Sequence, residues 1–393
     1  MFPEIEYHTR LKRLQECLCK QEIALAILSD NVDLYYYSGS VKPLYALIPA
    51  EGEPVLLARK ALEQIASEVP WAKLEFFNNS KELRQIIEKN QLQQAEKIGL
   101  PLDRIPYNTV LRWQQFFPQT EIVDLAWELR KLRMIKSSLE IEIQRRAGKV
   151  MSGVPKVVRE AFYAGITELE LSTALECYFR LNRHTGLVRC HREAVEMNYG
   201  ICSGGVHSLA GTKFEGICSG LGLSPSVPYG ATALPIHQGE AVVLDYAFNL
   251  EGYHVDQTRM FSWGEPDQKV YQAYQAMYLI EQELIKELKP GKSWGELYDL
   301  ALQIAAQEGF ATEFMGLSTD KVKFVGHGLG LELDEPPFLA IGMEELLAVG
   351  MVLALEPKVS LPGIGVVGIE DTLVITETGV ESLTKCETEM IIV

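Results

Sequence analysis

Two acidic residues lie in a stretch that otherwise has the pattern of a buried β-hairpin, and this conflict constrains the chain more than any other feature. Residues 241–264, AVVLDYAFNLEGYHVDQTRMFSWG, hold two β-favouring runs on either side of the turn signal Asn-Leu-Glu-Gly. If Phe248 pairs with Tyr253, the antiparallel register places Asp245 opposite Asp256. Directly opposed Cβ atoms lie roughly 4.5–5.5 Å apart. Because two buried carboxylates at that distance repel each other, the pattern favours a compensating cation, although unrelated strand-end acids are the alternative.

A second acidic pair near the C-terminus strengthens this interpretation. Residues 351–356 (MVLALE) and 366–376 (VVGIEDTLVIT) have strand-like patterns, and the intervening PKVSLPGIG is rich in turn-forming residues. A register centred on Gly363 places Glu356 opposite Glu370. The same arrangement of facing acids therefore occurs twice.

Length and composition indicate an ordinary globular protein with room for two domains. The chain has 393 residues, of which 47% are hydrophobic. We expect an α/β domain over residues 1–126 and a second domain over residues 127–393. A segment rich in Gly, Ser and Pro, residues 198–239, precedes the first acidic hairpin and predicts loops over one face of a sheet, where functional sites tend to lie.

Charge and cysteine content narrow the partners and the compartment. The net charge of −16 argues against a nucleic acid or an anionic membrane as a partner. Seven cysteines without a CxxC pair fit reduced thiols better than a disulfide framework. The N-terminus carries charges where a signal peptide needs an apolar core, and apolar runs fall short of the ~18–20 residues that span a bilayer. We therefore expect a cytoplasmic protein.

One histidine joins the four acids as a candidate metal ligand. His327 lies between glycines in KFVGHGLGLELDEPP, where the backbone can approach a ligand closely, although a single histidine often has only a structural role. Two divalent cations would neutralise four carboxylates. For oxygen donors with one imidazole we expect Mn²⁺ or Co²⁺ first, with Fe²⁺ or Zn²⁺ as alternatives. Two such ions can hold a hydroxide, polarise a carbonyl and stabilise an oxyanion, so the predicted reaction is hydrolysis.

At these motifs the sequence resembles the pita-bread metallopeptidases, which include prolidase, aminopeptidase P, methionine aminopeptidase and the metal-free creatinase. The resemblance covers nearly the whole chain and rests on LRKLRMIKSSLEIE, GEAVVLDYAF, GYHVDQTRMF, GHGLGLELDEPP, LALEP and GIEDTLVIT. It implies an α+β fold, in which a C-terminal pita-bread (creatinase/aminopeptidase) domain follows a smaller α/β creatinase-type N-terminal domain. It also implies a small peptide or amide substrate and a homodimer.

The same resemblance implies a dinuclear metal site and assigns its ligands. The five ligand positions are Asp245, Asp256, His327, Glu356 and Glu370. By resemblance, Asp256 and Glu370 would bridge both metals. Asp245 would bind one of them, and His327 with Glu356 the other. Glu356 is also a candidate catalytic residue that would accept a proton from the attacking water.

Three positions depart from the pattern of the family's proline-specific peptidases. Tyr229 and Asp334 stand where those enzymes usually have histidines, and Gly368 stands where they often have an arginine. Those groups help to bind substrate and to stabilise the transition state, so their replacement weakens the expectation of Xaa-Pro cleavage. Tyr229 and Asp334 themselves are the candidate catalytic replacements. Other residues that could substitute, although each fits an ordinary loop position better, are His207, His237 and Lys358.

Three functions are therefore open from the sequence. The leading hypothesis is a dinuclear metal-dependent hydrolase of the Xaa-Pro dipeptidase or aminopeptidase class, which cleaves dipeptides or short peptides. The second keeps the fold and the metals but acts on a non-peptide amide, or as a metal-assisted lyase. The third is a catalytically silent binding protein, against which the complete set of ligand positions argues.

Overall fold

The computed structural model describes residues 2–191, 196–211, 213 and 216–393, and the chain divides into two compact units, Met1–Arg133 and Met134–Val393. The expected boundary between residues 126 and 127 lies at the start of helix α6 (Ala126–Met134). This helix packs with the first unit, because Arg133 forms a buried ion pair with Asp33 at 2.7 Å. The Tyr36 hydroxyl also donates to the Leu132 carbonyl at 3.2 Å.

The first unit is built on one six-stranded mixed sheet in the order β4-β3-β2-β1-β5-β6. Leu25 and Ile27 of β1 share a core with helices α4 and α5, and helix α1 lies against β2. Its strands are β1 (Leu25–Leu28), β2 (Tyr45–Pro49), β3 (Val55–Ala58), β4 (Lys73–Phe76), β5 (Lys97–Leu100) and β6 (Glu121–Asp124). Its other helices are α1 (Glu4–Lys20), α2 (Asn31–Ser38), α3 (Leu62–Glu68), α4 (Ser80–Lys89), the short η1 (Leu92–Gln94) and α5 (Tyr107–Phe116).

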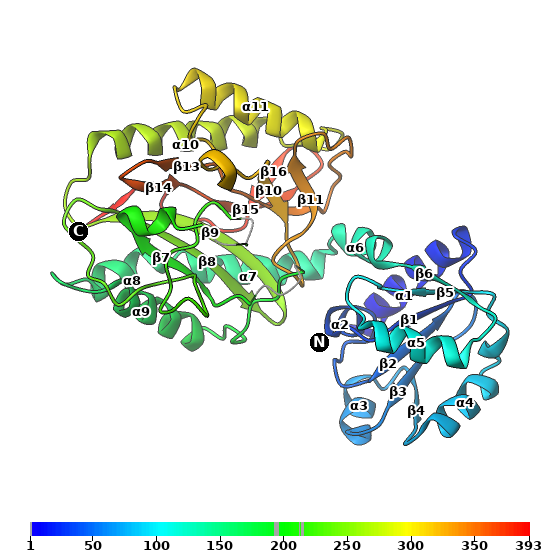
Figure 1. Ribbon diagram of the computed structural model, residues 1–393. Helices are drawn as coiled ribbons and strands as arrows, with labels where there is room; N and C mark the ends of the chain where they lie inside the picture. The colour runs from blue at the N-terminus through cyan, green and yellow to red at the C-terminus, as the bar shows by residue number, and fades with distance from the viewer. Residues whose placement is uncertain (1, 192–195, 212, 214–215) are drawn as a thin grey trace. The chain divides into compact units, whose positions relative to one another are not determined.

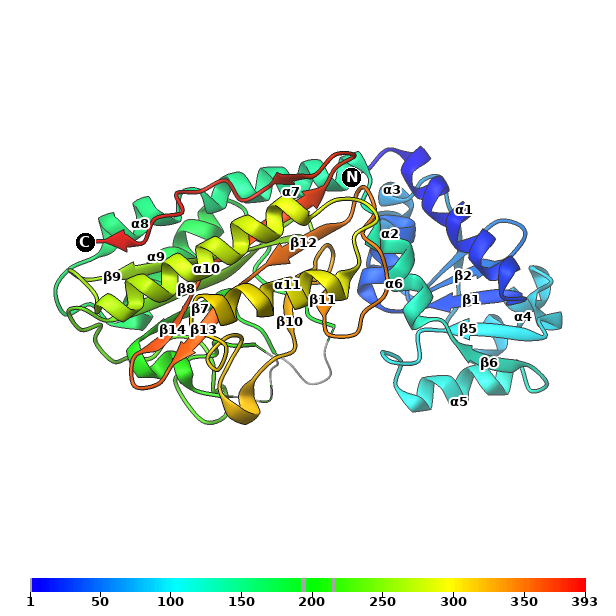
Figure 2. The same ribbon diagram turned by 90° about the horizontal axis from the view of Figure 1, so that it is seen from above.

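The second unit places its strands between two layers of helices (Figures 1 and 2). Its helices are α7 (Ser138–Met151), α8 (Val154–Ala161), α9 (Glu168–Leu181), η2 (Gly205–Leu209), α10 (Gln268–Glu287), α11 (Trp294–Gln307) and η3 (Ser318–Asp320). Its strands are β7 (Gly200–Gly204), β8 (Ala241–Leu250), β9 (Tyr253–Ser262), β10 (Phe324–Gly328), β11 (Glu335–Ala340), β12 (Val352–Leu355), β13 (Lys358–Leu361), β14 (Gly365–Gly368), β15 (Asp371–Ile375), β16 (Val380–Ser382) and β17 (Ile391–Ile392).

Local sequence signals explain how these layers form. Helix α9 begins with a capping box, in which the Thr167 side chain accepts from the Glu170 backbone and the Glu170 side chain accepts from the Thr167 backbone. Helices α7 and α9 cover the sheet β17-β9-β8-β7, and α10 and α11 cover the strands β13, β14, β10 and β11. Within the described residues, no helix combines the length and the apolar character needed to cross a membrane.

The first acidic hairpin forms as predicted, but its turn is shorter. Leu250 pairs with Tyr253, so the loop has only two residues, Glu251 and Gly252. Both have positive φ, 54° and 96°, as a type I′ hairpin turn requires. The Asn249 side chain accepts from the backbone N–H of Gly252 at 3.0 Å and so belongs to the strand end rather than to the loop.

The shorter turn moves the register by two residues. Asp245 pairs with Thr258 and Asp256 pairs with Ala247, so the predicted direct pairing of Asp245 with Asp256 is wrong. Side chains alternate between faces with a period of two, and an even shift therefore leaves both acids on the same face as diagonal neighbours.

The second acidic hairpin keeps its predicted register but is longer than predicted. Leu355 pairs with Asp371, and β13 pairs with β14 in the same register centred on Gly363. Glu356 and Glu370 therefore face each other between these two ladders. The segment that we expected to be a turn forms the strands β13 and β14, and only residues 362–364 connect them.

Candidate metal centre

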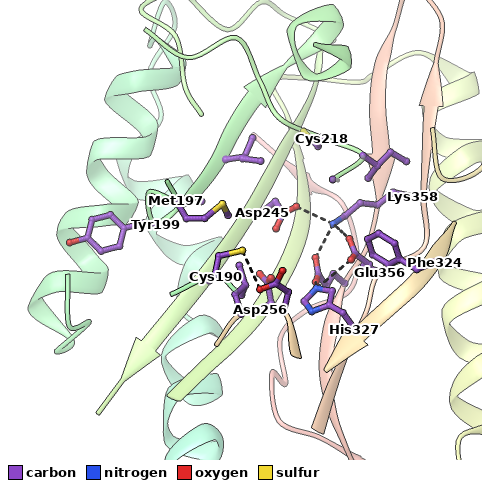
Figure 3. Close-up of a pocket in the computed structure, with 18 residues that line it drawn as sticks. Cys190, Met197, Tyr199, Cys218, Asp245, Asp256, Phe324, His327, Glu356 and Lys358 are labelled. Atoms are coloured by element: carbon purple, nitrogen blue, oxygen red, sulfur yellow. Dashed lines mark hydrogen bonds and ion pairs between the residues drawn. The ribbon is translucent and has the colours of Figure 1, made fainter. Parts of the chain in front are cut away.

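The four acids and His327 line one pocket of the second unit (Figure 3). Asp245 lies on β8, Asp256 on β9 and His327 on β10. Glu356 directly follows β12, and Glu370 directly precedes β15. The two hairpins and β10 thus bring together acids and a histidine from distant parts of the chain.

His327 is oriented as a metal ligand. Its Nδ1 lies 3.2 Å from the backbone carbonyl oxygen of Gly328, which can only accept, and this contact favours the tautomer with the proton on Nδ1. Its Nε2 lies 3.4 Å from Glu356 Oε1 and 4.0 Å from Glu370 Oε1, and in that tautomer its lone pair is available to a cation in the pocket. The ligand atoms of Asp256, His327 and Glu370 all lie within 4.8 Å of one another.

The glycines beside His327 allow close approach of strands rather than of a ligand. A Cβ on Gly326 would lie 2.5 Å from the carbonyl oxygen of Ala354, and one on Gly328 would lie 2.3 Å from that of Pro336. Strand β10 lies between β11 and β12 in its sheet. The two glycines therefore let the histidine strand fit between its neighbours.

A buried lysine lies among the carboxylates. Lys358 is 1% exposed, and its Nζ lies 3.0 Å from Asp245 Oδ2. The same Nζ lies 2.8 Å from Glu356 Oε2 and 2.9 Å from Glu370 Oε2. An ammonium has three donor hydrogens, so these contacts use all of them. Burial alone would lower the pKa of Lys358, but the three carboxylates raise it well above its ordinary value, so the side chain is a cation.

Lys358 is the residue at this site whose place the sequence analysis missed. It lies in a buried strand, and the expectation of an ordinary loop residue is therefore wrong. Its cross-strand partner is Gly368, and a Cβ on that glycine would lie 2.3 Å from Lys358 Cγ. The register centred on Gly363, which pairs the two glutamates, also pairs the lysine with a residue small enough to admit its stem.

The crowding of carboxylates is reflected in their proton affinities. Burial, followed by the carboxylates of Glu370 and Asp245, raises the pKa of Asp256 well above its ordinary value. Burial also raises the pKa of Asp245, against the opposing effect of Lys358. Lys358 makes no hydrogen bond to Asp256 and offsets its pKa rise only in part, so a cation on the Asp256 side would further favour the ionised form.

The residues present fit one divalent ion on the histidine side. Glu370 Oε1 is buried and has no hydrogen-bond partner among the described residues, whereas its Oε2 accepts from Thr258 Oγ1 at 2.7 Å. Such an unpaired buried oxygen calls for an explanation, and an ion shared with Asp256 and His327 provides one. Two oxygens and an imidazole suit Mn²⁺, Co²⁺, Fe²⁺ or Zn²⁺. A second ion on the opposite side would meet the Lys358 ammonium instead.

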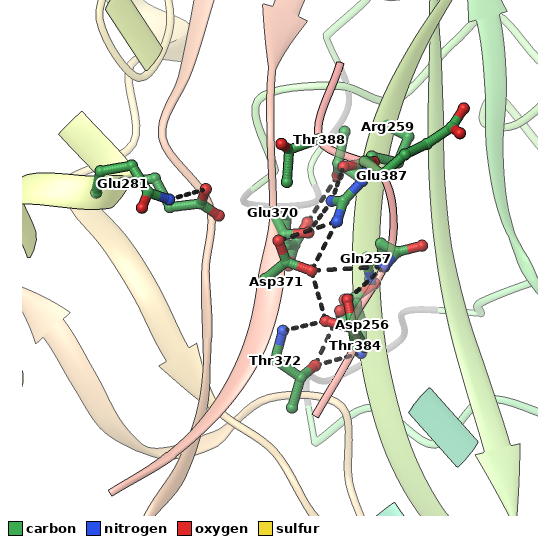
Figure 4. Close-up of polar contacts among 12 residues, drawn as sticks. Asp256, Gln257, Arg259, Glu281, Glu370, Asp371, Thr372, Thr384, Glu387 and Thr388 are labelled. Carbon is green, nitrogen blue, oxygen red and sulfur yellow. Dashed lines mark hydrogen bonds and ion pairs between the residues drawn. The ribbon is translucent and has the colours of Figure 1, made fainter. Parts of the chain in front are cut away.

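A polar network behind the carboxylates fixes the ligand strands relative to each other (Figure 4). The buried Arg259 guanidinium donates to both carboxylate oxygens of Asp371, at 2.9 and 3.0 Å. It also donates to the carbonyls of Thr258 and Glu370, at 2.9 Å each, and of Glu387, at 2.8 Å. Thr258 and Glu370 in addition exchange two backbone hydrogen bonds of 3.3 Å. These contacts join β9 to the start of β15 beside the ligands.

Comparison with known proteins places this arrangement in a family. The family model of the creatinase/prolidase N-terminal domain matches residues 10–135, and that of metallopeptidase family M24 matches residues 142–377. The chain belongs to metallopeptidase family M24. The recognition of this family and of its two-domain α+β fold is confirmed, and the protein is an enzyme of the metallopeptidase class.

Relatives of this M24 chain are similar over most of their length. An uncharacterized peptidase of Bacillus subtilis is 30% identical over 298 residues, which are 76% of this chain and 75% of that protein. An Xaa-Pro dipeptidase of Pyrococcus horikoshii is 27% identical over 384 residues, 97% of this chain and 98% of that protein. The crystal structure of the prolidase from Pyrococcus horikoshii has a TM-score of 0.79 at 26% identity, covering 98% of this chain and 100% of that one. An Xaa-Pro dipeptidase structure from Bacillus anthracis, with a TM-score of 0.82 at 22% identity over 98% and 100% of the two chains, supports the fold.

The two candidate catalytic replacements of this M24 chain lie in different surroundings. Asp334 lines the pocket, where its Oδ1 accepts from the backbone N–H of His191 at 2.9 Å and from Cys190 Sγ at 3.1 Å. Tyr229 is not among the residues that line the pocket, and burial together with the Glu196 carboxylate raises the pKa of its phenol. The structure thus brings Asp334, but not Tyr229, to the cluster.

His207 and His237, the two histidines considered as substitutes for the missing ones, also lie outside the pocket lining. His207 Nδ1 lies 3.3 Å from Glu168 Oε1. The backbone N–H of His237 donates to the Glu240 carboxylate at 2.8 Å. Lys358 is therefore the substitute that the fold places at the site.

Proposed function

We propose that this protein is a metal-dependent peptidase that cleaves dipeptides or short peptides, with Xaa-Pro dipeptides as the first substrates to test. The observation that carries the proposal is the convergence of Asp256, His327 and Glu370 within 4.8 Å in a domain of family M24. Relatives that match nearly the whole chain are named Xaa-Pro dipeptidases, which supports a dipeptide with proline at its second position.

The residues around the cluster have distinct proposed roles. A divalent cation held there, Mn²⁺ or Co²⁺ before Fe²⁺ or Zn²⁺, would act as a Lewis acid toward a peptide carbonyl and lower the pKa of water. Glu356 is the proposed proton acceptor, because its Oε1 faces the same space as His327 Nε2 while its Oε2 is held by Lys358. The Asp334 carboxylate in the pocket wall suits the ammonium of a peptide N-terminus. Tyr229 remains a proposed hydrogen-bond donor to bound substrate.

The test is hydrolysis of a panel of Xaa-Pro dipeptides by the metal-stripped protein after Mn²⁺, Co²⁺ or Zn²⁺ is added back. Asp256→Ala removes one ligand of the cluster and is expected to lower the rate at least about 100-fold, the upper end of what one ligand-supporting contact costs. Asp299→Ala, which removes an exposed acid on α11, is the matched control and should keep the wild-type rate. A metal-loaded protein that cleaves no member of the panel would overturn the choice of substrate.

A second candidate is hydrolysis of a non-peptide amide, or a metal-assisted lyase reaction, at the same site. The observations that favour it are Asp334 in the pocket wall and Gly368 opposite Lys358, where histidine and arginine are usual in the peptidases that the chain resembles. Bound metal together with no dipeptide turnover would favour this candidate, and rapid cleavage of Xaa-Pro dipeptides would reject it.

The assembly and the location of the protein are also proposals. We propose a homodimer, which the resemblance to prolidase and creatinase supports, and a location in the cytoplasm, which the free cysteines support. Light scattering on the purified protein distinguishes a monomer from a dimer, and fractionation of the source cells tests the location.

A further inference from the structure

We propose that the Lys358 ammonium takes the place of one of the two divalent cations expected at this site, so that the centre binds a single ion. The inference rests on the proposed metal-dependent function, because it concerns the same carboxylates. It replaces the dinuclear centre that the sequence led us to expect.

The first observation is that the two glutamates divide their oxygens between two positions. Oε2 of Glu356 and Oε2 of Glu370 contact Lys358 Nζ at 2.8 and 2.9 Å. Oε1 of the same two residues lies 3.4 and 4.0 Å from His327 Nε2. Each carboxylate therefore turns one oxygen toward the ammonium and the other toward the space beside His327 Nε2, so it would bridge the ammonium and a cation held in that space.

The second observation is that Lys358 occupies the space that a second ion would need. Three oxygens, one each from Asp245, Glu356 and Glu370, surround its Nζ at 2.8–3.0 Å. A divalent ion bound to the same three oxygens would lie about 2.0–2.2 Å from each and so within the volume of the ammonium. Like charge adds to this overlap, so a second ion cannot bind while the lysine is in place.

The third observation is that the strand pairing and burial fix the position of the Lys358 side chain. Lys358 lies on β13 and pairs with Gly368 on β14, and its stem runs where a Cβ at position 368 would collide with its Cγ. Its carbonyl accepts from the backbone N–H of Met315 at 2.9 Å. The side chain is 2% exposed, and all three ammonium hydrogens have carboxylate acceptors.

The donor atoms that Lys358 leaves available form one site. They are the Asp256 carboxylate, His327 Nε2 and Glu370 Oε1, and the last of these is buried without a hydrogen-bond partner among the described residues. One divalent ion at this position would be bound by all three groups, and Glu356 Oε1, 3.4 Å from His327 Nε2, would lie beside it as the proposed proton acceptor. We therefore assign the single ion to the Asp256 and His327 side.

Metal content measured independently of activity tests the inference. The protein is loaded with Mn²⁺, freed of excess ion by gel filtration, and examined by elemental analysis and electron paramagnetic resonance. We expect one Mn²⁺ per wild-type chain with the spectrum of an isolated ion. Lys358→Ala should bind two ions with the multiline spectrum of a coupled pair. Lys136→Met is the matched control, because it removes another buried lysine of the same unit, paired with Glu335 at 2.8 Å, and should still bind one.

The outcomes separate this inference from the proposed function. Two coupled ions in the wild-type chain would overturn the inference and leave metal-dependent catalysis intact, whereas no bound ion would overturn both. A folded Lys358→Ala chain that still binds only one ion would contradict the claim that Lys358 prevents a second ion from binding. If the alanine variant does not fold, Lys358→Met keeps the apolar stem without the charge, and the wild-type spectrum alone still decides the number of ions.

Discussion

Replacement of Arg259 by methionine is expected to destabilise the second unit strongly. Methionine keeps much of the apolar stem but removes the five hydrogen bonds of the guanidinium, two of which go to Asp371. Asp371 is 6% exposed, and it would keep only neutral partners such as Thr384 Oγ1 at 2.6 Å. Leaving one member of a buried ion pair without its partner costs about 3–5 kcal/mol of unfolding free energy. At this domain size the loss corresponds to a fall in Tm of about 6–20 °C.

A lysine at the same position separates charge from geometry. Lys keeps the positive charge but has only three donors, so at least two of the five acceptor atoms around Arg259 lose the hydrogen bond that the guanidinium makes. We expect Arg259→Lys to cost about 1–3 kcal/mol, less than the methionine variant, because the buried Asp371 charge stays compensated.

Differential scanning calorimetry and urea unfolding measure these losses. The first unit has its own core and supplies an internal reference, since its unfolding transition should not move. Bound metal should also decrease in Arg259→Met, because the guanidinium holds the carbonyl groups of Thr258 and Glu370 in place beside the ligands. A loss below about 1 kcal/mol for Arg259→Met, or a larger loss for lysine than for methionine, would refute the reasoning.

Three further predictions follow from buried groups of the second unit. Burial lowers the pKa of His254 from 6.5 to about 3. Below pH 6.5 this histidine is protonated in the unfolded chain but stays neutral in the folded chain. Its contribution to the free energy of unfolding should therefore fall by about 1.4 kcal/mol per pH unit. His254→Gln should flatten this slope in urea titrations between pH 6 and 4, and an unchanged slope would contradict the assignment. Gly148→Ala should lower Tm, because the new Cβ would lie 2.0 Å from the Leu383 carbonyl oxygen, whereas Gly379→Ala, with nothing within 4 Å, should not. A chelator should lower Tm without unfolding the protein at 25 °C, since Lys358 keeps three carboxylates paired; loss of the circular dichroism signal would argue otherwise.

The β-favouring runs and the turn signals between them were sufficient to predict the two acidic hairpins and the faces of their acids. The sequence predicted a four-residue turn with Phe248 paired to Tyr253, whereas a two-residue loop forms, in which Glu251 and Gly252 adopt left-handed conformations. The error in register did not affect the prediction that the acids lie together, because a shift by two residues keeps Asp245 and Asp256 on one face of the sheet. All four acids and His327 line one pocket.

Local sequence could not reveal the role of Lys358. The segment PKVSLPGIG contains prolines and glycines that favour a turn, and a lysine in a turn is normally exposed. Its burial is compensated by carboxylates from β8 and from the ends of two other strands, so the stabilising contacts are all tertiary. The sequence alone predicted the order and type of the acids. The buried position of Lys358 among them depends on contacts with residues distant in the sequence.

The bridge between Thr258 and Glu370 also determines when the site can appear during biosynthesis. The two residues are 112 positions apart, and their mutual hydrogen bonds form only after the intervening helices and strands have been enclosed in a loop of that length. Long loops close late in folding, because the chain loses conformational entropy on closure before the contacts that stabilise the closed loop have formed. A chain still on the ribosome that lacks Glu370 has no complete set of ligands. Binding of the proposed metal ion therefore requires that Glu370 has been synthesised and that the two hairpins have already met.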